Sequence, residues 1–349
     1  MRKVWFGLVF LALISLGFSL DLNLWKTDNW WNDSYKMRAL IKVTSPKEQV
    51  AVFPVDLGDL DTDCAVRFVA FDNKTLLPYF AECDEKVFWV KANLSKETHI
   101  WVYYNATSPV SNSTSEIFYW SPEKVSDWDI ISMDSRNVFE KVNGRFHFNT
   151  TWDTMYNENT TLVVIEPKNN TNDFFASVRI QPMSFRDPSD LVVGITSFKT
   201  PSSTQYPRGL MGYVIRYERE VFSSFIIALN YTEGRVEEAP ITILPGEKVR
   251  FLFHYFIDSS KNTANLTMSV KGATFNTSLN LDQVYDERFV VKSAGSEGYI
   301  DYVFVVPNYD VDAVVQYQQV YRKELNWVLI ILLAGIVALF LICLDMLEG

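Results

Sequence analysis

The chain has 349 residues, of which 48% are hydrophobic and 15% aromatic, and its formal net charge is −10. A chain of this length holds about two domains, and its apolar content is sufficient to build a core in each of them. The negative charge offers no basic surface for nucleic acid, so a nucleic-acid-binding function is not expected.

The N-terminus has the pattern of a secretory signal peptide. Residues 1–3 are Met-Arg-Lys, and residues 4–18 are apolar but too few for a comfortable membrane span. Gly17 and Ser19 provide the small residues that a signal peptidase requires, so we expect residues 1–19 to be the signal peptide. The alternative is an uncleaved anchor. Either interpretation places the following residues outside the cytoplasm.

The C-terminal region contains the most apolar segment of the chain. Residues 325–344 carry no charge and no proline. About twenty residues at 1.5 Å per residue span a hydrocarbon core about 30 Å thick. A buried core helix is the alternative, although such a helix usually carries a polar stripe. We expect a transmembrane helix at 325–344, a juxtamembrane stalk at 313–324 and a short cytoplasmic tail at 345–349. The protein would then be a single-pass cell-membrane protein whose bulk is extracellular.

Residues 20–112 have the pattern of short β-strands. Met37, Ala39, Ile41 and Val43 alternate with their neighbours, and further short runs follow at 49–55, 65–71, 77–81, 87–92 and 99–104. Strands at this spacing, without amphipathic helices between them, predict an antiparallel β-sandwich rather than a parallel α/β fold. A segment rich in Ser, Thr and Pro at 106–116 is expected to be a linker.

Several motifs in residues 30–110 occur in a recognisable order. They are Arg67-Phe68, Phe71-Asp72, Leu77-Pro78-Tyr79, Phe88–Lys91 and Ile100–Asn105. This order resembles an uncharacterised β-sandwich domain family of archaeal and bacterial surface proteins. Members of that family carry an "RF…D…LPY" core and a closing "YYGN" strand, and some are fused to proton-channel proteins of the MotA/TolQ/ExbB type. Asn105 directly follows Tyr104 here, so the family's glycine is missing. The resemblance implies a sandwich domain and no catalytic residues.

Residues 113–312 show the same alternation over a longer stretch, which predicts two large packed sheets. Three segments are similar to concanavalin A-like lectin/glucanase (laminin-G-like) sandwiches: Trp128 with Val142-Asn143-Gly144, Phe174–Ile180 and Tyr299–Tyr309. The expected fold is therefore all-β, with two antiparallel β-sandwich (jelly-roll/concanavalin-like) domains and one C-terminal transmembrane helix.

The chain has three cysteines. Cys343 lies in the apolar C-terminal segment, which leaves Cys64 and Cys83 as a candidate disulfide in an oxidising compartment. Two separately buried thiols are the alternative. His99, His147 and His254 are scattered without metal-ligand spacing, so we expect no zinc site.

Asn-x-Ser/Thr acceptors are frequent, whereas random placement would give about three. Their excess favours a glycosylated ectodomain, although a turn-rich β protein also gathers Asn, Ser and Thr. The candidate acceptors are Asn32, Asn73, Asn93, Asn105, Asn112, Asn149, Asn159, Asn169, Asn230, Asn265 and Asn276.

The sequence shows no catalytic apparatus. Glucanases on this type of sandwich place paired acids in an E-x-D-x-E spacing, which is absent here, and Glu237 and Glu238 are adjacent and therefore point to opposite faces of a strand. There is no G-x-S-x-G elbow, no glycine-rich phosphate loop and no histidine-based triad. We therefore expect no enzyme, with a diverged glycoside hydrolase as a remaining alternative.

Two acidic turns could hold calcium, which prefers six to eight oxygen ligands. One contains Asp56, Asp59, Asp61 and Asp63, and the other is Asp187-Pro188-Ser189-Asp190. Solvated acidic turns are the alternative, so no cofactor is expected apart from a possible calcium ion.

Exposed aromatic side chains beside amides or carboxylates could serve as sugar platforms, while core packing is the alternative for each of them. The candidates are Trp120, Trp152, Tyr156, Tyr206 and Tyr217. The leading hypothesis is a membrane-anchored extracellular binding or adhesion protein that recognises envelope glycans or a partner protein through its concanavalin-like domain. The alternative is a structural subunit of a cell-envelope or membrane complex.

Overall fold

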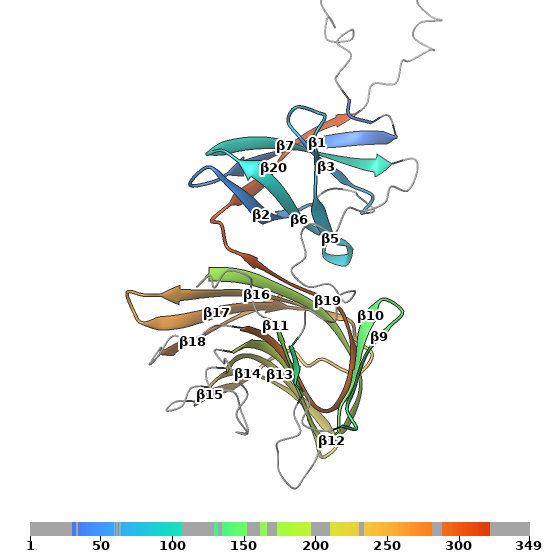
Figure 1. Cartoon of the computed structure of the whole chain (residues 1–349), viewed down its shortest axis with the longest axis vertical. Helices are drawn as coiled ribbons and strands as arrows, with labels where there is room; N and C mark the ends of the chain where they lie inside the picture. The colour runs from blue at the N-terminus through green and yellow to red at the C-terminus, as the bar shows by residue number, and fades with distance from the viewer. Residues whose placement is uncertain are drawn as a thin grey trace, which may run out of the picture. The chain divides into compact units, whose positions relative to one another are not determined.

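The computed structural model describes most of the chain between residues 30 and 321. The described residues are 30–32, 34–58, 60, 62, 64–106, 129–131, 135–151, 161–165, 173–196, 210–229, 234–280 and 288–321. They form β-strands almost throughout, and the chain divides into two compact units (Figure 1). Unit 1 takes residues 1–113 and 311–349, and unit 2 takes residues 114–310. Unit 2 is therefore inserted into the sequence of unit 1.

Unit 1 is a sandwich of two antiparallel sheets. The five-stranded sheet has the order β20 (Asp312–Tyr321), β1 (Tyr35–Thr44), β7 (Glu97–Ala106), β3 (Arg67–Ala70), β4 (Leu76–Leu77). The three-stranded sheet has the order β2 (Gln49–Asp56), β6 (Val87–Leu94), β5 (Tyr79–Glu82), and a 3-10 turn, η2 (Cys83–Glu85), follows β5. The predicted alternation is confirmed, because Ala39, Ile41 and Val43 of β1 are fully buried.

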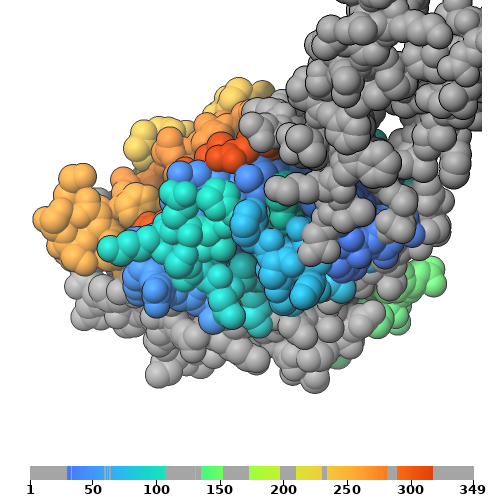
Figure 2. Space-filling model, turned by 90° about the horizontal axis from the view of Figure 1, so that it is seen from above, coloured from blue at the N-terminus to red at the C-terminus, as the bar shows by residue number. Residues whose placement is uncertain are grey.

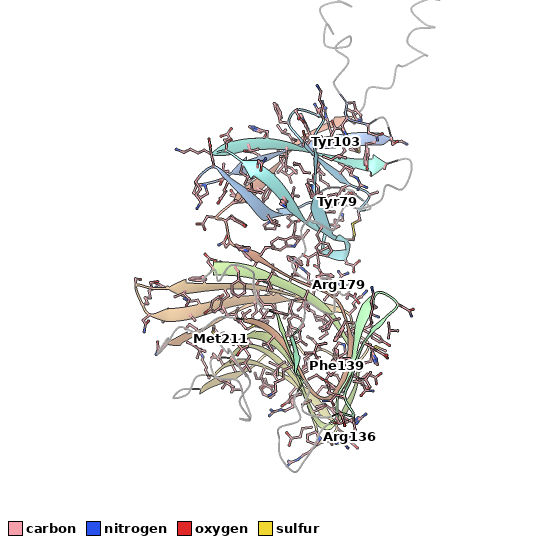
Figure 3. All side chains as sticks on the ribbon, viewed as in Figure 1. Tyr79, Tyr103, Arg136, Phe139, Arg179 and Met211 are labelled. Atoms are coloured by element: carbon pink, nitrogen blue, oxygen red, sulfur yellow. A yellow bond between two sulfur atoms is a disulfide. The ribbon has the colours of Figure 1, made fainter. Side chains whose placement is uncertain are left out.

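Tyr79 of β5, labelled in Figure 3, is bonded through its hydroxyl group to the start of β3 in the other sheet of unit 1. Tyr79 donates its hydroxyl proton to the Val66 carbonyl at 2.6 Å, and the Arg67 guanidinium donates to the same hydroxyl oxygen. The Tyr79 ring packs edge-on against Phe68, at 5.1 Å between centroids. Burial raises the pKa of Tyr79 to about 12, against the opposing effect of Arg67.

The expected stalk at 313–324 is wrong over most of its length. Residues 312–321 form β20, which pairs with β1 along the edge of the five-stranded sheet. Figure 2 shows the red-orange atoms of β20 beside the blue atoms of β1. Val314 is exposed and Val315 is partly buried. This alternation suits an edge strand that has one face covered by the sandwich. Residues 312–321 are therefore part of the sheet of unit 1 and not a linker to the membrane.

Unit 2 is a larger sandwich built on two long bent strands, β12 (Asp173–Thr196) and β19 (Arg288–Pro307). The first part of β12 pairs with β16 (Val249–Asp258), and its last part pairs with β13 (Leu210–Glu218). β19 follows β12 through both parts, so each long strand belongs to both layers. The remaining strands are β8 (Asp129–Ile131), β9 (Val138–Val142), β10 (Arg145–Asn149), β11 (Thr161–Ile165), β14 (Val221–Leu229), β15 (Gly234–Glu238), β17 (Thr263–Val270) and β18 (Ala273–Asn280).

The core of unit 2 lies between the two layers that share β12 and β19. Alternate residues of β16 and β17, such as Phe251, Phe253, Leu266 and Met268, are buried in it, as the period of two predicts. Met211 contributes from β13 in the other layer (Figure 3). The described residues thus form a nearly all-β protein with sandwich-like sheets, as expected from the sequence.

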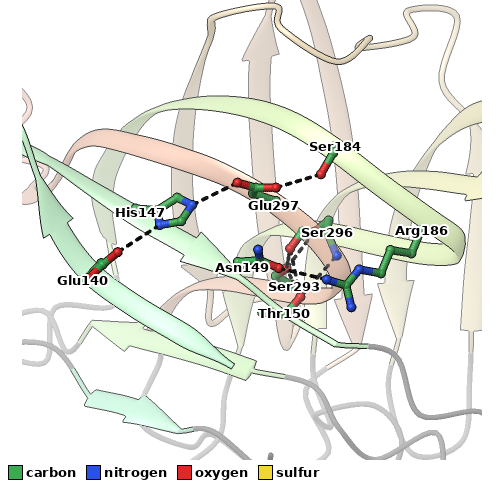
Figure 4. A network of polar contacts seen from close by, with 9 residues as sticks. All are labelled: Glu140, His147, Asn149, Thr150, Ser184, Arg186, Ser293, Ser296 and Glu297. Carbon is green, nitrogen blue, oxygen red and sulfur yellow. Dashed lines mark hydrogen bonds and ion pairs between the residues drawn. The ribbon is translucent and has the colours of Figure 1, made fainter. Parts of the chain in front are cut away.

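A buried hydroxyl cluster stabilises the bend of β19. The Thr150 and Ser293 hydroxyls are 2.7 Å apart, and Ser293 and Ser296 are also 2.7 Å apart. Thr150 also donates its hydroxyl proton to the Ser296 carbonyl at 3.0 Å. Gly295 has a φ of +72°, a conformation that favours glycine. These contacts fix the turn that carries β19 from one layer to the other (Figure 4).

Several expected segments lie outside the described residues: the signal peptide at 1–19, most of the linker at 106–116, the transmembrane segment at 325–344 and the tail at 345–349. In the part of the chain that the structure does describe, no helix has the length and apolarity needed to cross a membrane.

Candidate functional site

A polar row crosses three neighbouring strands of unit 2. His147 of β10 lies opposite Tyr299 of β19, and Tyr299 lies opposite Gln181 of β12. Phe146 and Phe148 of β10 are buried in the core, so the intervening residues of β10 point to the other face of the sheet. We call this set the Tyr299 row; it comprises Arg145, His147, Gln181, Glu297, Tyr299 and Asp301.

The Tyr299 ring is the centre of the row. The Arg145 guanidinium carbon lies 4.5 Å from the ring centroid, and the His147 ring lies 5.0 Å away at an interplanar angle of 32°. The cation over the ring face contributes an attraction of about 0.5–2 kcal/mol. Among the described residues, no hydrogen bond to the Tyr299 hydroxyl occurs, and the Tyr299 side chain is partly exposed.

Arg145 links Tyr299 to a chain of polar groups at one end of the row. Its Nε donates to Asp301, and its Nη2 donates to Gln181 Oε1 at 2.8 Å. Lys248 Nζ lies 2.7 Å from Asp301 Oδ2, and Gln181 Nε2 donates to the Gly246 carbonyl at 2.9 Å. The Asp301 carboxylate is thus shared between two cations. These fixed contacts hold the side chains in one arrangement before any ligand binds.

His147 forms the other end of the row between two carboxylates (Figure 4). His147 Nε2 lies 3.2 Å from Glu297 Oε1, and Nδ1 lies 3.6 Å from Glu140 Oε1. Ser184 donates its hydroxyl proton to the second Glu297 oxygen at 3.0 Å. The His147 side chain is only 14% exposed, whereas Glu297 and Glu140 are 35% and 58% exposed. Solvent and small ligands therefore reach the carboxylates rather than the imidazole.

The chemistry of the row suits a ligand with several hydroxyl groups. Carboxylates accept hydrogen bonds, guanidinium, ammonium and amide groups donate them, and a phenol does both. Arg145 and Lys248 share the single carboxylate of Asp301, and Glu297 supplies a second negative charge in the row. The row and Lys248 together therefore have two cations matched by two carboxylates, with no net positive charge for an anionic ligand, and they offer both donors and acceptors.

The sequence prediction of sugar platforms did not identify this row. Trp120, Trp152, Tyr156 and Tyr206 lie outside the described residues. Tyr217 is described; it is half-buried on β13 and packs against Phe222, with 4.6 Å between ring centroids. The missed signal was the alternation of Arg145, His147 and Asn149 with two buried phenylalanines, which exposes one polar face of a strand.

The two acidic segments that could bind calcium are only partly described. Asp59, Asp61 and Asp63 lie outside the described residues, while the exposed Asp56 accepts a hydrogen bond from the Gly58 amide at 2.7 Å. The second expected turn, residues 187–190, lies within strand β12, where Asp190 accepts two hydrogen bonds from Arg216, at 2.8 and 3.0 Å. No cluster of three potential metal ligands occurs within the described ranges.

Cys64 and Cys83 are joined by a disulfide, with 5.5 Å between their Cα atoms. The bond connects the segment before β3 to the η2 turn after β5. It therefore links the region next to one sheet of unit 1 to the end of the other sheet, and it lies at the surface, since Cys83 is exposed.

The candidate glycosylation acceptors occupy different environments. Asn93 and Asn276 are exposed, whereas Asn73 accepts a hydrogen bond from the Tyr103 hydroxyl at 2.8 Å and Asn105 contacts the Met37 sulfur at 3.0 Å. Three further acceptors are partly buried: Asn32, Asn149 and Asn265. Four lie outside the described residues: Asn112, Asn159, Asn169 and Asn230.

The adjacent Glu237 and Glu238 lie on strand β15 and are exposed. Glu237 pairs with Arg235, and its backbone neighbour across the sheet is Ile226, whereas Glu238 lies opposite Phe225. Consecutive residues of a strand point to opposite faces, so these two carboxylates do not converge on one substrate.

Known proteins give only weak comparisons with this chain. No protein-family model and no curated protein matches the chain, so the resemblance of residues 30–110 to a surface-protein family gains no support. Solved structures give partial similarities. An endo-β-1,4-glucuronan lyase from the fungus Trichoderma reesei is 13% identical with a TM-score of 0.37, covering 52% of this chain and 92% of that one.

Two lectin-type structures are similar at the same level. Peanut lectin is 11% identical with a TM-score of 0.35, covering 56% of this chain and 95% of that one. The legume lectin-like domain from Entamoeba histolytica is 9% identical with a TM-score of 0.34, covering 54% of this chain and 90% of that one. The case for a function therefore rests on the side chains of the Tyr299 row.

Proposed function

We propose that this chain is a membrane-anchored extracellular protein that binds an uncharged glycan through the Tyr299 row of unit 2. The observation that carries the proposal is the partly exposed Tyr299 side chain beside the Arg145 guanidinium and the His147 ring. A sugar presents hydroxyl groups that both donate and accept hydrogen bonds, which suits a phenol hydroxyl with carboxylate, guanidinium and amide groups around it.

The charge pairing of the row selects among glycans. Arg145 and Lys248 both pair with Asp301, so a uronate or sulfate would have to compete with a carboxylate that is already in place. A neutral sugar can instead donate to Glu297, which is 35% exposed, and accept from Lys248, which is 46% exposed. Hydrogen bonds to charged groups contribute about 1.5–3 kcal/mol each.

The cellular placement is supported by two sequence patterns and by the disulfide of unit 1. The basic start and apolar stretch of residues 1–19 favour export, and the apolar segment 325–344 favours a single membrane span. The disulfide between Cys64 and Cys83 suits an oxidising compartment.

A glycan array probed with the full chain in nanodiscs tests this function. The wild type is expected to retain neutral oligosaccharides in preference to uronate-containing or sulfated ones, and Tyr299→Ala is expected to abolish retention. Tyr217→Ala is the matched control, because it removes a half-buried tyrosine of another strand. A blank array for the wild type, or equal retention by Tyr299→Ala, would contradict the proposal.

A second candidate is a structural subunit of an envelope or membrane complex. Phe71 and Leu76 of unit 1 are 59% and 50% exposed, and such apolar side chains suit contact with a protein neighbour. Cross-linking in intact membranes would give a discrete larger species under this hypothesis and only monomer under glycan recognition by isolated chains.

A further inference from the structure

The last strand of unit 1 determines where the chain leaves the domain. β20 runs antiparallel to β1, so that Tyr321 lies opposite Met37, while Asp312 lies opposite Thr44. Across β1, Tyr104 of β7 also lies opposite Met37. The start of β1, the end of β7 and the end of β20 therefore share one end of the five-stranded sheet.

Two tryptophans gather beside the start of β1. The Trp30 and Trp31 rings lie 5.3 and 5.8 Å from the Tyr103 ring, and Trp31 lies 5.6 Å from Tyr35. Trp30 donates its Nε1–H to the Tyr35 carbonyl at 3.0 Å, which fixes the ring. Tyr35 and Tyr103 are fully buried, whereas Trp30 and Trp31 remain partly exposed. We call this group the tryptophan end of unit 1.

Positive charge accompanies the tryptophan end. The Arg38 guanidinium carbon lies 4.8 Å from the centre of the Trp30 ring and 4.2 Å from that of Trp101. Lys36 is exposed on the same stretch of β1, and Arg322 and Lys323 follow β20 directly in the sequence. Tryptophan, tyrosine and cations together have the composition of the zone where proteins contact lipid headgroups.

The length of the connection limits how far this end can stand from a membrane. Tyr321 precedes Leu325, the first residue of the apolar segment, by four residues. Four residues reach at most about 14 Å when fully extended. The headgroup layer on each side of a bilayer is itself roughly 5–8 Å thick. The end of β20 is thus held close to the headgroups.

We propose that the tryptophan end of unit 1 docks into the headgroup layer of the membrane that carries the chain's own apolar segment. This inference rests on the membrane anchor of the proposed function and is independent of glycan binding. Docking would hold unit 1 against the lipid surface through Trp30 and Trp31, with the exposed Lys36 beside anionic headgroups. A flexible stalk would leave the same domain free to tumble.

Quenching of tryptophan fluorescence by brominated lipids tests the docking. The full chain is placed in vesicles of phosphatidylcholine and phosphatidylglycerol whose acyl chains carry bromine near the headgroup. All variants carry Trp327→Phe, because Trp327 lies in the apolar segment itself. In this background the quenched component is expected to be lost in the Trp30→Phe/Trp31→Phe variant and retained in Trp89→Phe, because Trp89 is fully buried in unit 1. Equal quenching of the double variant and its Trp327→Phe parent would overturn the docking.

A second variant protects the test against misfolding. A flexible Gly/Ser insertion between Arg322 and Lys323 leaves the tryptophan end intact but lengthens the connection to the apolar segment. Docking predicts that the quenched component persists, because the tryptophan end itself contacts the headgroups. Loss of quenching would show that the short connection alone caused the signal, which would overturn the proposal. Alkaline carbonate extraction separates the two claims: release of the wild-type chain from the vesicles refutes the anchor itself, whereas retention without quenching refutes only the docking.

Discussion

Met37 and Tyr321 face each other across β1 and β20, although they lie near the two ends of the described chain. Unit 1 is therefore completed only after unit 2 has been traversed. β20 covers the edge of β1 that would otherwise expose unpaired backbone groups. The stability of unit 1 consequently depends on a segment that follows unit 2 in the sequence.

Removing β20 should loosen β1. A chain ending at Asp310 lacks the strand, whereas a chain ending at Tyr321 keeps it, so the second is the matched control. We expect the amides of Tyr35–Thr44 to exchange hydrogen much faster in the shorter chain, because one edge of β1 loses its partner. Hydrogen–deuterium exchange with mass spectrometry measures this, and equal protection in both chains would contradict the role assigned to β20.

The disulfide should stabilise unit 1 measurably. Cys64 and Cys83 are 19 positions apart, and closing a loop of this size contributes about 3 kcal/mol in the chain-entropy description. The Cys64→Ser/Cys83→Ser variant is expected to unfold at a lower urea concentration, while Cys343→Ser, which leaves this bond intact, is expected to match the wild type. An unchanged midpoint in the double variant would refute this contribution.

Tyr79 should make unit 1 sensitive to alkaline pH. Burial raises its pKa to about 12 in the folded chain, compared with the ordinary tyrosine value of 10.0. Because the folded pKa is the higher one, the stabilisation is complete below pH 10 and is lost as the pH rises to about 12. The loss amounts to roughly 2–3 kcal/mol.

Urea unfolding of unit 1 at a series of pH values between 9 and 12 measures the effect of Tyr79. Tyr79→Phe is expected to be less stable at pH 9, since it lacks the hydrogen bond to Val66, and to show a flatter pH profile. Parallel profiles for the two proteins would show that the Tyr79 hydroxyl does not ionise differently in the folded state.

Lys292 should make unit 2 more stable as the pH rises, whereas Tyr79 makes unit 1 less stable. Burial lowers its pKa to about 8, and Asp190 opposes the shift. Because the folded pKa is below the unfolded one, raising the pH from 8 toward 10.5 removes the cost of the buried charge, and stability rises. The gain is roughly 2 kcal/mol between pH 8 and 10.

Lys292→Met isolates that effect. The variant has no ammonium group, so its unit 2 transition is expected not to gain stability between pH 8 and 10. Thermal melts of the two proteins at matched pH provide the comparison. A wild-type transition that is flat over this range would contradict the assignment.

Alternation of apolar residues predicted the strands well where each strand buries one face. Val249, Phe251, Phe253 and Tyr255 recur at every second position and are all buried in β16. The spacing of apolar residues was enough to predict which side chains of β16 are buried, because the period of two is a property of a single strand.

Properties that depend on pairing between distant strands were not predictable in the same way. Residues 313–321 contain three glutamines and lie close to the apolar C-terminal segment, so the sequence favours a stalk, while their register with β1 is visible only in the fold. The Tyr299 row was missed for the same reason: His147 and Tyr299 belong to strands that are far apart in sequence, and only sheet formation brings them together.

The most direct test of the central claim is an isothermal titration of the full chain in nanodiscs with a neutral oligosaccharide from the array. The account predicts that Tyr299→Ala and Gln181→Ala each weaken binding by about tenfold or more, corresponding to about 1.4 kcal/mol, while Tyr217→Ala binds like the wild type. Wild-type affinity in both row variants, or loss of binding confined to Tyr217→Ala, would contradict glycan recognition at the Tyr299 row.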